Sequence, residues 1–244
     1  MEHRDQEGEE GDVILAAWCA IALGGLVQTT AGFGFALVSS PVVVAALGPT
    51  EAVRAVITLS SLISVLILAR TWRHTRLRDA LLLAVPAVVL AAPAAVLVHH
   101  MNTRLLTVAA GAVTVTGAAL MARGNRRLPL RGPGGVCAVG LASALMNALG
   151  GLSGPAGAIY AANDEWPPEA IAPTLQVFGL ILNAASLTTL GGPELDYRLA
   201  TALPVGWLCG IWVARRLSAS HLHRIVLAVA AAGGAAAMMR AAVG

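Results

Sequence analysis

Two long apolar runs in this chain are interrupted by glycines and then resume as short apolar segments that end at proline. The interruptions are Gly32-Phe33-Gly34 and Gly150-Gly151-Leu152-Ser153-Gly154. A shift of about 118 positions superimposes Gly32 on Gly150 and Pro49 on Pro167, so the chain is interpreted as a diverged tandem duplication. In an apolar chain, paired glycine-interrupted segments at matching positions of two halves indicate the binding site of a transporter.

Composition assigns the chain to the membrane. Hydrophobic residues make up 57% of its 244 residues and charged residues only 12%, about half the charged share of a soluble domain. A soluble fold could not bury this much apolar surface. We therefore expect an all-α polytopic protein of the cytoplasmic membrane, built from two inverted repeats of about five hydrophobic segments each.

The apolar runs predict helices, two of which are too short to cross the membrane. At 1.5 Å per residue the segments 35–47 and 155–163 reach only about 20 Å and about 14 Å, against a hydrocarbon core of roughly 30 Å. The sequence leaves open whether they cross or are re-entrant. Both breaks should face the protein interior, because lipid cannot satisfy broken backbone. The expected helices are 13–31, 35–47, 51–70, 79–99, 103–122, 135–149, 155–163, 169–190, 198–214 and 222–241.

Arginine placement orients the chain, because short cytoplasmic loops collect positive charge. If each repeat crosses five times, the arginine-rich stretches at 70–78, 123–131 and 215–224 share one side. An odd number of crossings makes the repeats inverted, whereas re-entrant short segments would give an even number and remove this argument. The expected divisions are a polar acidic tail over 1–12, a first repeat over 13–122, a basic cytoplasmic linker over 123–134 and a second repeat over 135–241.

The two breaks are where binding chemistry is expected. A helix that begins inside the membrane presents unpaired N–H groups and about half a positive charge, so two such ends facing each other would form an anion site. Glycine lets a ligand approach the main chain closely. The predicted floor of the site is Gly32, Gly34, Gly150, Gly151, Ser153 and Gly154. The preceding helix ends add side-chain hydrogen bonds from Gln28, Thr29, Thr30 and Asn147.

Two further amides are candidates for the same site. Gln176 and Asn183 lie seven residues apart on the expected helix 169–190 and therefore share a face. Intramembrane amides either bind substrate or hydrogen-bond neighbouring helices, and the sequence does not decide between these roles. The breaks have a similar alternative, because glycines also let helices pack closely and hydroxyl groups can bond their own backbone. Arg54 would either draw an anion toward the outer mouth or extend to the interface.

The sequence predicts no catalytic residue, no metal site and no cofactor. Cys19, Cys137 and Cys209 lie in apolar runs without metal or disulfide spacing, so we expect buried thiols. His99 and His100 lie near a predicted interface and lack metal-ligand spacing. No acidic side chain is placed at mid-membrane, so no carrier for proton coupling is visible.

The residues around the breaks resemble the TauE/SafE sulfite exporter family of bacterial permeases. The resemblance rests on Gly32-Phe33-Gly34-Phe35 with Pro41 and Gly48, and on the segment 150–157, and it extends over about residues 13–241. It implies export or uptake of small anions such as sulfite, sulfonates or related organic acids. The first motif has fewer glycines than the family pattern, and the segment 91–95 is alanine-rich where the family is often glycine-rich, so the substrate is left open.

The sequence therefore predicts a permease that moves a small anion through a site at the two breaks. Its expected partners are the anionic substrate and the lipid bilayer, with no nucleic acid. The small-residue face at Gly206 and Gly210 could pack within one subunit or in a homodimer. A non-transporting scaffold or sensor subunit fits the same composition. A membrane-embedded enzyme would need clustered His, Asp or Glu residues, which the sequence does not show.

Overall fold

The computed structural model describes residues 2–122, 130, 132–214, 216, 235 and 239. In this part of the chain every regular element is helical, which confirms the all-α prediction. Five of the helices are long and apolar enough to cross a membrane, as expected for a polytopic protein. The elements are α1 (Glu2–Ala31), α2 (Phe35–Leu47), α3 (Pro49–Thr71), the 3-10 helix η1 (Trp72–His74), α4 (Leu77–His99), α5 (Thr103–Ala122), α6 (Gly132–Gly150), α7 (Gly154–Asn163), α8 (Pro168–Thr189), α9 (Tyr197–Ala200) and α10 (Ala202–Ala214).

The predicted helix boundaries differ from the structure mainly at the two ends of the chain. The helix expected to start at residue 13 begins at Glu2, so the polar tail continues α1. The helix expected over 198–214 is divided at Thr201 into α9 and α10. Apart from a few positions, the expected helix over 222–241 and the linker over 123–134 lie outside the described residues.

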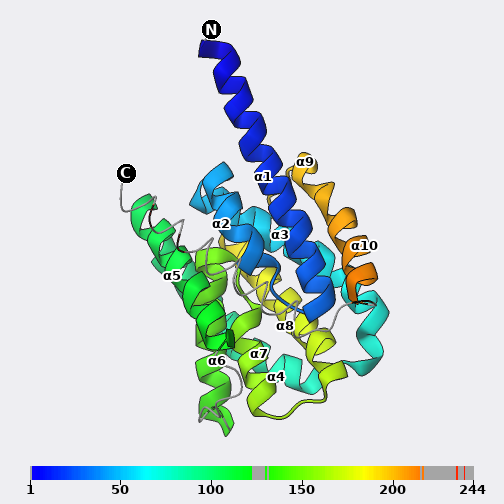
Figure 1. Ribbon diagram of the computed structural model, residues 1–244. Helices are drawn as coiled ribbons and strands as arrows, with labels where there is room; N and C mark the ends of the chain where they lie inside the picture. The colour runs from blue at the N-terminus through cyan, green and yellow to red at the C-terminus, as the bar shows by residue number, and fades with distance from the viewer. Residues whose placement is uncertain are drawn as a thin grey trace.

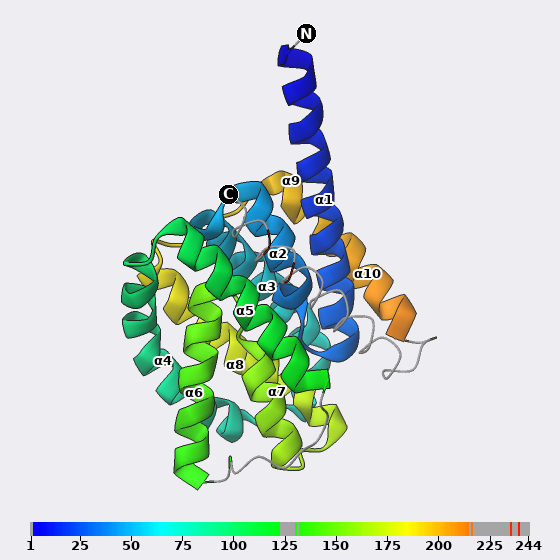
Figure 2. The ribbon, with the colours of Figure 1, turned by 60° about the vertical axis from the view of Figure 1, so that its left-hand side comes forward.

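The third helices of the two repeats, α3 and α8, form the centre of the bundle and run antiparallel (Figures 1 and 2). Asn183 on α8 donates to Ser61 on α3 over 3.1 Å. Closer to the start of α3, Arg54 donates to the carbonyl of Gly192, just beyond the end of α8. On one side α1 packs along α10, and on the other α6 packs along α4. The first helix of each repeat therefore packs against a helix of the other repeat. The equivalent helices α3 and α8 run in opposite directions, which is the arrangement of inverted repeats.

The short helices α2 and α7 turn back along the helices that precede them. α2 packs against α1 and α7 against α6, so each pair is a hairpin whose tip is a glycine break. Trp18 on α1 donates to Thr201, and Arg54, seven residues beyond the end of α2, binds the segment 191–194. Both partners belong to the connection between α8 and α10. The two legs of the α1–α2 hairpin thus meet the same end of the molecule, which favours a re-entrant α2.

Inverted repeats are compatible with re-entrant short segments in this arrangement. Because a hairpin enters and leaves at one end, it contributes no net crossing. Three helices, α3, α4 and α5, follow the first hairpin; α3 and α4 are long and apolar enough to cross a membrane, and the apolar part of α5 is shorter. The boundaries of the two repeats remain a prediction.

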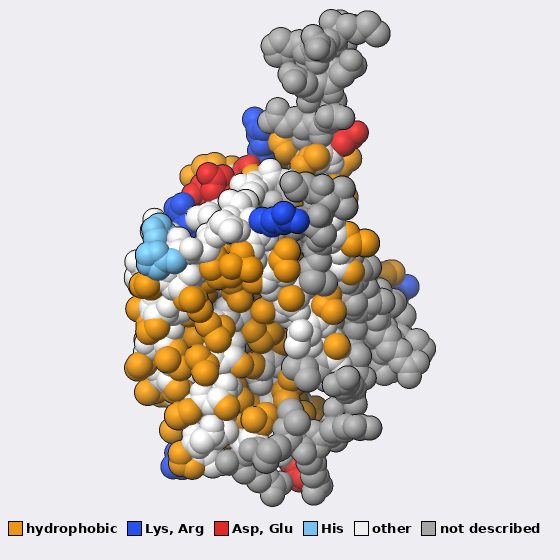
Figure 3. Space-filling model, turned by 90° about the vertical axis from the view of Figure 1, so that its left-hand side faces the viewer, with side chains coloured by type: hydrophobic (Ala, Val, Ile, Leu, Met, Phe, Trp, Pro, Cys, Tyr) orange, Lys and Arg blue, Asp and Glu red, His pale blue; other side chains and the backbone are white. Residues whose placement is uncertain are grey.

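On the face shown in Figure 3, hydrophobic side chains cover the middle, and charged side chains lie near the upper and lower ends. The expectation of buried thiols is wrong, because Cys19, Cys137 and Cys209 are all exposed. Lipid is as apolar as a helix interface, so hydrophobicity alone does not distinguish a lipid-facing position from a core position. Arg54 and Arg70 lie toward opposite ends of α3, in agreement with charge at both rims.

Close approach of α1 and α10 depends on the small-residue face of α10, which packs within the subunit. A Cβ at Gly206 would collide with the backbone of Ala22, and a Cβ at Gly210 would lie 2.7 Å from Cβ of Thr29. Without a hydrophobic driving force between helices, such close contact supplies the van der Waals attraction that holds membrane helices together.

We expect Gly206→Val to lower the free energy of unfolding by about 1–3 kcal/mol or more, because overpacking pushes α1 and α10 apart. The measurement is denaturant unfolding in detergent micelles. Val205→Leu on the same helix is the matched control, because Val205 is 42% exposed. Equal stability of the two variants would contradict the packing role of Gly206.

Candidate functional site

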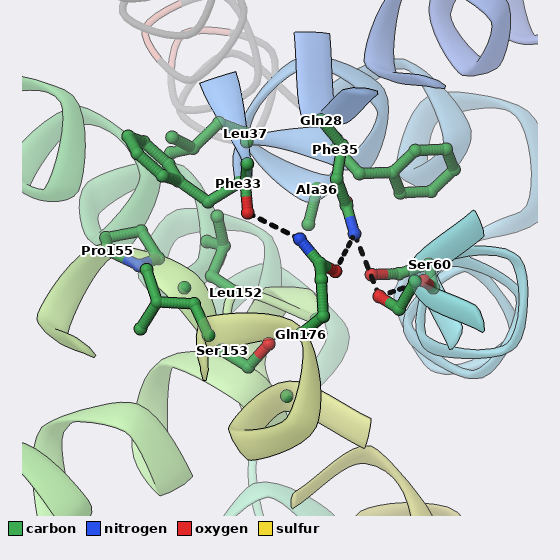
Figure 4. A pocket seen from close by; sticks show the side chains of 17 residues that line it. Gln28, Phe33, Phe35, Ala36, Leu37, Ser60, Leu152, Ser153, Pro155 and Gln176 are labelled. Carbon is green, nitrogen blue, oxygen red and sulfur yellow. Dashed lines mark hydrogen bonds between the residues drawn. The ribbon is translucent and has the colours of Figure 1, made fainter. Parts of the chain in front are cut away.

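The tips of the two hairpins come together around one small internal cavity (Figure 4). It measures about 30 Å³, which exceeds the roughly 10–15 Å³ that one water requires. α1, α3 and α8 complete its wall. The lining residues are Gln28, Gly32, Phe33, Gly34, Phe35, Ala36, Leu37, Ser60, Ser64, Gly151, Leu152, Ser153, Gly154, Pro155, Leu175, Gln176 and Gly179.

The first break requires glycine for its backbone conformation and for its packing. Gly32 and Gly34 have φ of 81° and 110°, values that side chains other than glycine rarely adopt. A Cβ at Gly32 would lie 2.8 Å from the Cα of Ala172 on α8. The Gly32 carbonyl, freed by the end of α1, accepts a hydrogen bond from Nε2 of Gln176. A side chain of the second repeat therefore satisfies the broken backbone of the first.

The second break is closed mainly by its own helix. Gly151 has φ of 71° and donates its N–H to the Asn147 carbonyl over 2.8 Å, while Leu152 donates to the Met146 carbonyl over 3.3 Å. A Cβ at Gly151 would lie 2.8 Å from Cγ1 of Val56 on α3. Each break therefore packs against the third helix of the other repeat.

The structural equivalent of Gly32 is Gly151 rather than Gly150. Both are the first residue after a helix and both have a left-handed conformation, whereas Gly150 is the last residue of α6. The offset between the repeats at the breaks is therefore one residue larger than the sequence superposition suggested. Two adjacent glycines at 150 and 151 allow either register when the sequence is compared alone.

A chain of hydrogen bonds connects three helices at the cavity. Nε2 of Gln28 donates to Oγ of Ser64 and to Oε1 of Gln176, both over 2.9 Å. Ser64 in turn donates to the carbonyl of Ser60 over 2.7 Å. Gln28 and Gln176 are 5% and 3% exposed. Figure 4 shows their amides meeting on one side of the cavity, with Phe33 and Pro155 on the other.

The first turns of α2 and α7 also line the cavity. No side chain caps either N-terminus, and the two ends meet where a Cβ at Gly154 would lie 3.0 Å from the Cβ of Phe33. All of the lining residues are uncharged. N–H groups at an uncapped helix N-terminus carry partial positive charge.

The family model for the sulfite exporter TauE/SafE matches residues 17–237 of the chain. The chain belongs to the TauE/SafE family. Membership identifies it as a multi-pass membrane transporter, of a family that moves sulfite or related anions. Searches of curated proteins and of solved structures gave no match.

Five predicted residues of this TauE/SafE protein lie outside the cavity lining. Thr29 and Thr30 donate their hydroxyl hydrogens to carbonyls of their own helix, Gly25 over 2.7 Å and Leu26 over 2.9 Å. Thr29 lines a separate cavity of about 220 Å³ instead. A Cβ at Gly150 would lie 3.1 Å from Cδ1 of Leu152.

The other two, Asn147 and Asn183, connect helices away from the cavity. Asn147 on α6 donates to Ser186 on α8 over 2.9 Å, and Asn183 donates to Ser61. The carbonyl oxygen of each amide is buried and has no hydrogen-bond partner among the described residues. Arg54 pairs with Glu194 at 3.1 Å and donates to the Gly192 carbonyl at the end of the molecule.

Two polar residues of the site, Ser60 and Ser64, were not predicted. They lie four residues apart inside the apolar run of α3, so they share a helix face and could have been found from that spacing. No comparable signal marks Gly179, which lies close to Oγ of Ser153. Within the described residues, no three His, Cys, Asp or Glu side chains come together in a way that could hold a metal ion.

We expect Gln176→Leu to lower the free energy of unfolding by about 1–3 kcal/mol, because it leaves the Gly32 carbonyl and a Gln28 donor unpaired in a buried place. Denaturant unfolding in micelles measures this, with the exposed Thr188→Val on the same helix as control. In a double-mutant cycle with Gln28→Leu, we expect a coupling energy of about 0.5–3 kcal/mol. Strict additivity would contradict the hydrogen-bonded chain.

Proposed function

We propose that the cavity between the two glycine breaks binds sulfite or a related small oxyanion, and that the protein carries this anion across the cytoplasmic membrane. The observation that supports the proposal most strongly is the convergence of both hairpin tips on one cavity. Membership of a transporter family agrees with this role.

The donors around the cavity suit an anion better than a cation. The helix N-termini of α2 and α7 present N–H groups without side-chain caps. The second N–H of the Gln176 amide and the Ser153 hydroxyl add further hydrogen-bonding capacity. Aligned positive helix ends would repel a cation, whereas an oxyanion can accept several hydrogen bonds at once.

The size of the cavity favours a ligand of few atoms. A volume of about 30 Å³ is far below the roughly 300–1,000 Å³ of a site for drug-sized molecules. The tight contacts around Gly154 and Gly151 leave little room for expansion. A small oxyanion held by its oxygens would need only slight movement of the hairpin tips.

The hairpins enter from opposite ends of the molecule, which supports alternating access. Movement of one hairpin relative to α3 and α8 would open the cavity toward one end while the other hairpin keeps the opposite end closed. The arginine-rich end that includes Arg70, Arg73 and Arg78 is assigned to the cytoplasm by the positive-inside rule.

We expect Gly154→Val to reduce sulfite flux in reconstituted vesicles by about tenfold or more, since a side chain at the tip of α7 displaces Phe33 and fills the cavity. Gly134→Val is the matched control on α6, because a Cβ at Gly134 has no atom within 4 Å. Correct insertion of both variants is verified by size-exclusion chromatography. Undiminished flux through Gly154→Val would contradict a site at the breaks.

A ligand-stabilisation screen measures the binding of different anions independently of transport. We expect sulfite to raise the melting temperature of the wild-type protein in micelles, while Gly154→Val shows a smaller shift, because only the folded state binds the anion. Sulfate, sulfonates and carboxylates form the comparison panel. A protein that no anion of the panel stabilises would support a scaffold or sensor subunit instead.

A further inference from the structure

Two buried asparagine amides beside the second break have an unpaired carbonyl oxygen. Asn147 on α6 and Asn183 on α8 are 0% and 1% exposed. The N–H side of each amide is satisfied by a serine, at 2.9 Å from Asn147 to Ser186 and at 3.1 Å from Asn183 to Ser61. Oδ1 of both asparagines has no hydrogen-bond partner among the described residues. Leaving a buried acceptor unpaired costs about 1–3 kcal/mol, and a ligand that binds these oxygens would remove that cost.

The symmetry of the repeats brings the two asparagine side chains together. The register of the breaks superimposes Asn147 on Gln28. It also superimposes Asn183 on Ser64, because α3 and α8 begin in that same register. In the first repeat these two positions are in direct contact, since Nε2 of Gln28 donates to Oγ of Ser64 over 2.9 Å. The two unpaired oxygens of the second repeat therefore belong to neighbouring side chains of α6 and α8.

Hydroxyl groups add further oxygens to this place. Ser143 lies one turn before Asn147 and shares its face of α6. It is fully buried, and its hydroxyl also has no hydrogen-bond partner in the part of the chain that the structure describes. Ser186 lies one turn beyond Asn183 on α8. We call this set, Ser143, Asn147, Asn183 and Ser186, the asparagine cluster. All of its side chains are neutral.

The chemistry of the asparagine cluster suits a small cation. Unpaired carbonyl oxygens repel an anion, whereas hard cations take amide and carbonyl oxygens as ligands. Asn147 lies in the last turn of α6, where the helix dipole adds partial negative charge. In transporters, such C-terminal ends of broken helices hold sodium ions.

The close packing of the asparagine cluster favours sodium over a larger ligand. Neither Oδ1 atom borders a space large enough for a water molecule. A sodium ion without its hydration shell is smaller than water, and a potassium ion is larger than sodium. The cluster has no carboxylate, which a divalent cation would require to balance its charge.

The asparagine cluster is joined to the anion cavity through one backbone hydrogen bond. The main-chain carbonyl of Asn147 accepts from the N–H of Gly151 over 2.8 Å, and Gly151 lines the cavity. An ion at each place would lie on either side of the same break. Burying a single charge among neutral groups is costly, and an opposite charge nearby reduces that cost.

We propose that the asparagine cluster binds a sodium ion whose binding is coupled to that of the anion at the second break. The inference rests on the proposed function and names a coupling ion for it. Each ion raises the affinity of the protein for the other, so both are bound in the same loaded state.

Sodium binding is tested first without sulfite, in the full-length protein in micelles. The melting temperature is measured in sodium, potassium and choline gluconate at equal ionic strength. Sodium should raise it, by an amount that grows with sodium concentration, because only the folded state has the site. Potassium and choline should not.

Variants of Asn183 locate the site. Asn183→Leu removes the oxygen and should abolish the sodium-dependent shift. Asn183→Asp retains an acceptor oxygen and should keep the shift, which separates loss of the ligand from loss of the fold. Thr188→Val is the matched control on α8, because Thr188 is exposed, and it should respond to sodium like the wild-type protein.

Coupling is tested by titrating sulfite in sodium and in potassium gluconate. Sodium should lower the dissociation constant of sulfite by about fivefold or more, the lower end of usual coupling energies. In reconstituted vesicles, an inward sodium gradient should drive sulfite uptake that an equal potassium gradient does not drive.

The proposal is overturned by equal melting temperatures in the three salts, by equal stabilisation with potassium, or by a sodium shift that persists in Asn183→Leu. The first of these results would assign the unpaired oxygens to a hydrogen-bond donor. Sulfite binding that sodium does not change rejects the coupling alone. Sulfite that binds in none of the salts rejects the central anion site, and the measurement without sulfite still decides whether sodium binds.

Discussion

The hydrogen bond from Gln176 to the Gly32 carbonyl is the interaction on which the arrangement of the site depends. Inside a bilayer there is no water to satisfy a backbone group released at the end of a helix, and each unsatisfied group costs several kcal/mol. Gln176 supplies the missing donor from α8, and Gln28 holds its amide in place. The tip of the first hairpin is thereby fixed to the third helix of the second repeat.

The two breaks solve the same problem in different ways, which makes the site asymmetric. At both breaks the first N–H returns to its own helix, from Gly32 to the Gln28 carbonyl and from Gly151 to the Asn147 carbonyl, and at the first break the Gly32 carbonyl also accepts a hydrogen bond from Gln176 on α8. The cavity consequently has hydrogen-bonding side chains near Gln28 and Gln176, and apolar side chains near Phe33, Leu152 and Pro155. Duplication supplied the geometry, and later divergence of single residues supplied the chemistry.

Small residues and loop contacts hold the hairpins in position around this centre. Gly206 brings α10 against α1, and Gly140 brings α6 against α4, where a Cβ would lie 2.8 Å from Cβ of Pro86. In both pairs, a helix of one repeat packs against a helix of the other. At the ends of the bundle, Arg54 pairs with Glu194 at 3.1 Å and Arg76 pairs with Asp79 at 2.6 Å. Ionised groups therefore lie at the rims, whereas the residues that line the central cavity are uncharged.

The sequence by itself determined the membrane class, the positions of most helices and the two breaks, because apolar length and glycine placement are local properties. It also selected Gln28, Gly32, Gly34, Gly151, Ser153, Gly154 and Gln176, which the fold brings to one cavity. Only the tertiary structure separated these from Thr29, Thr30, Asn147, Gly150 and Asn183. The physical reason is that a polar side chain in a membrane helix needs a partner, and whether that partner is its own backbone, a neighbouring helix or a cavity depends on packing between distant segments.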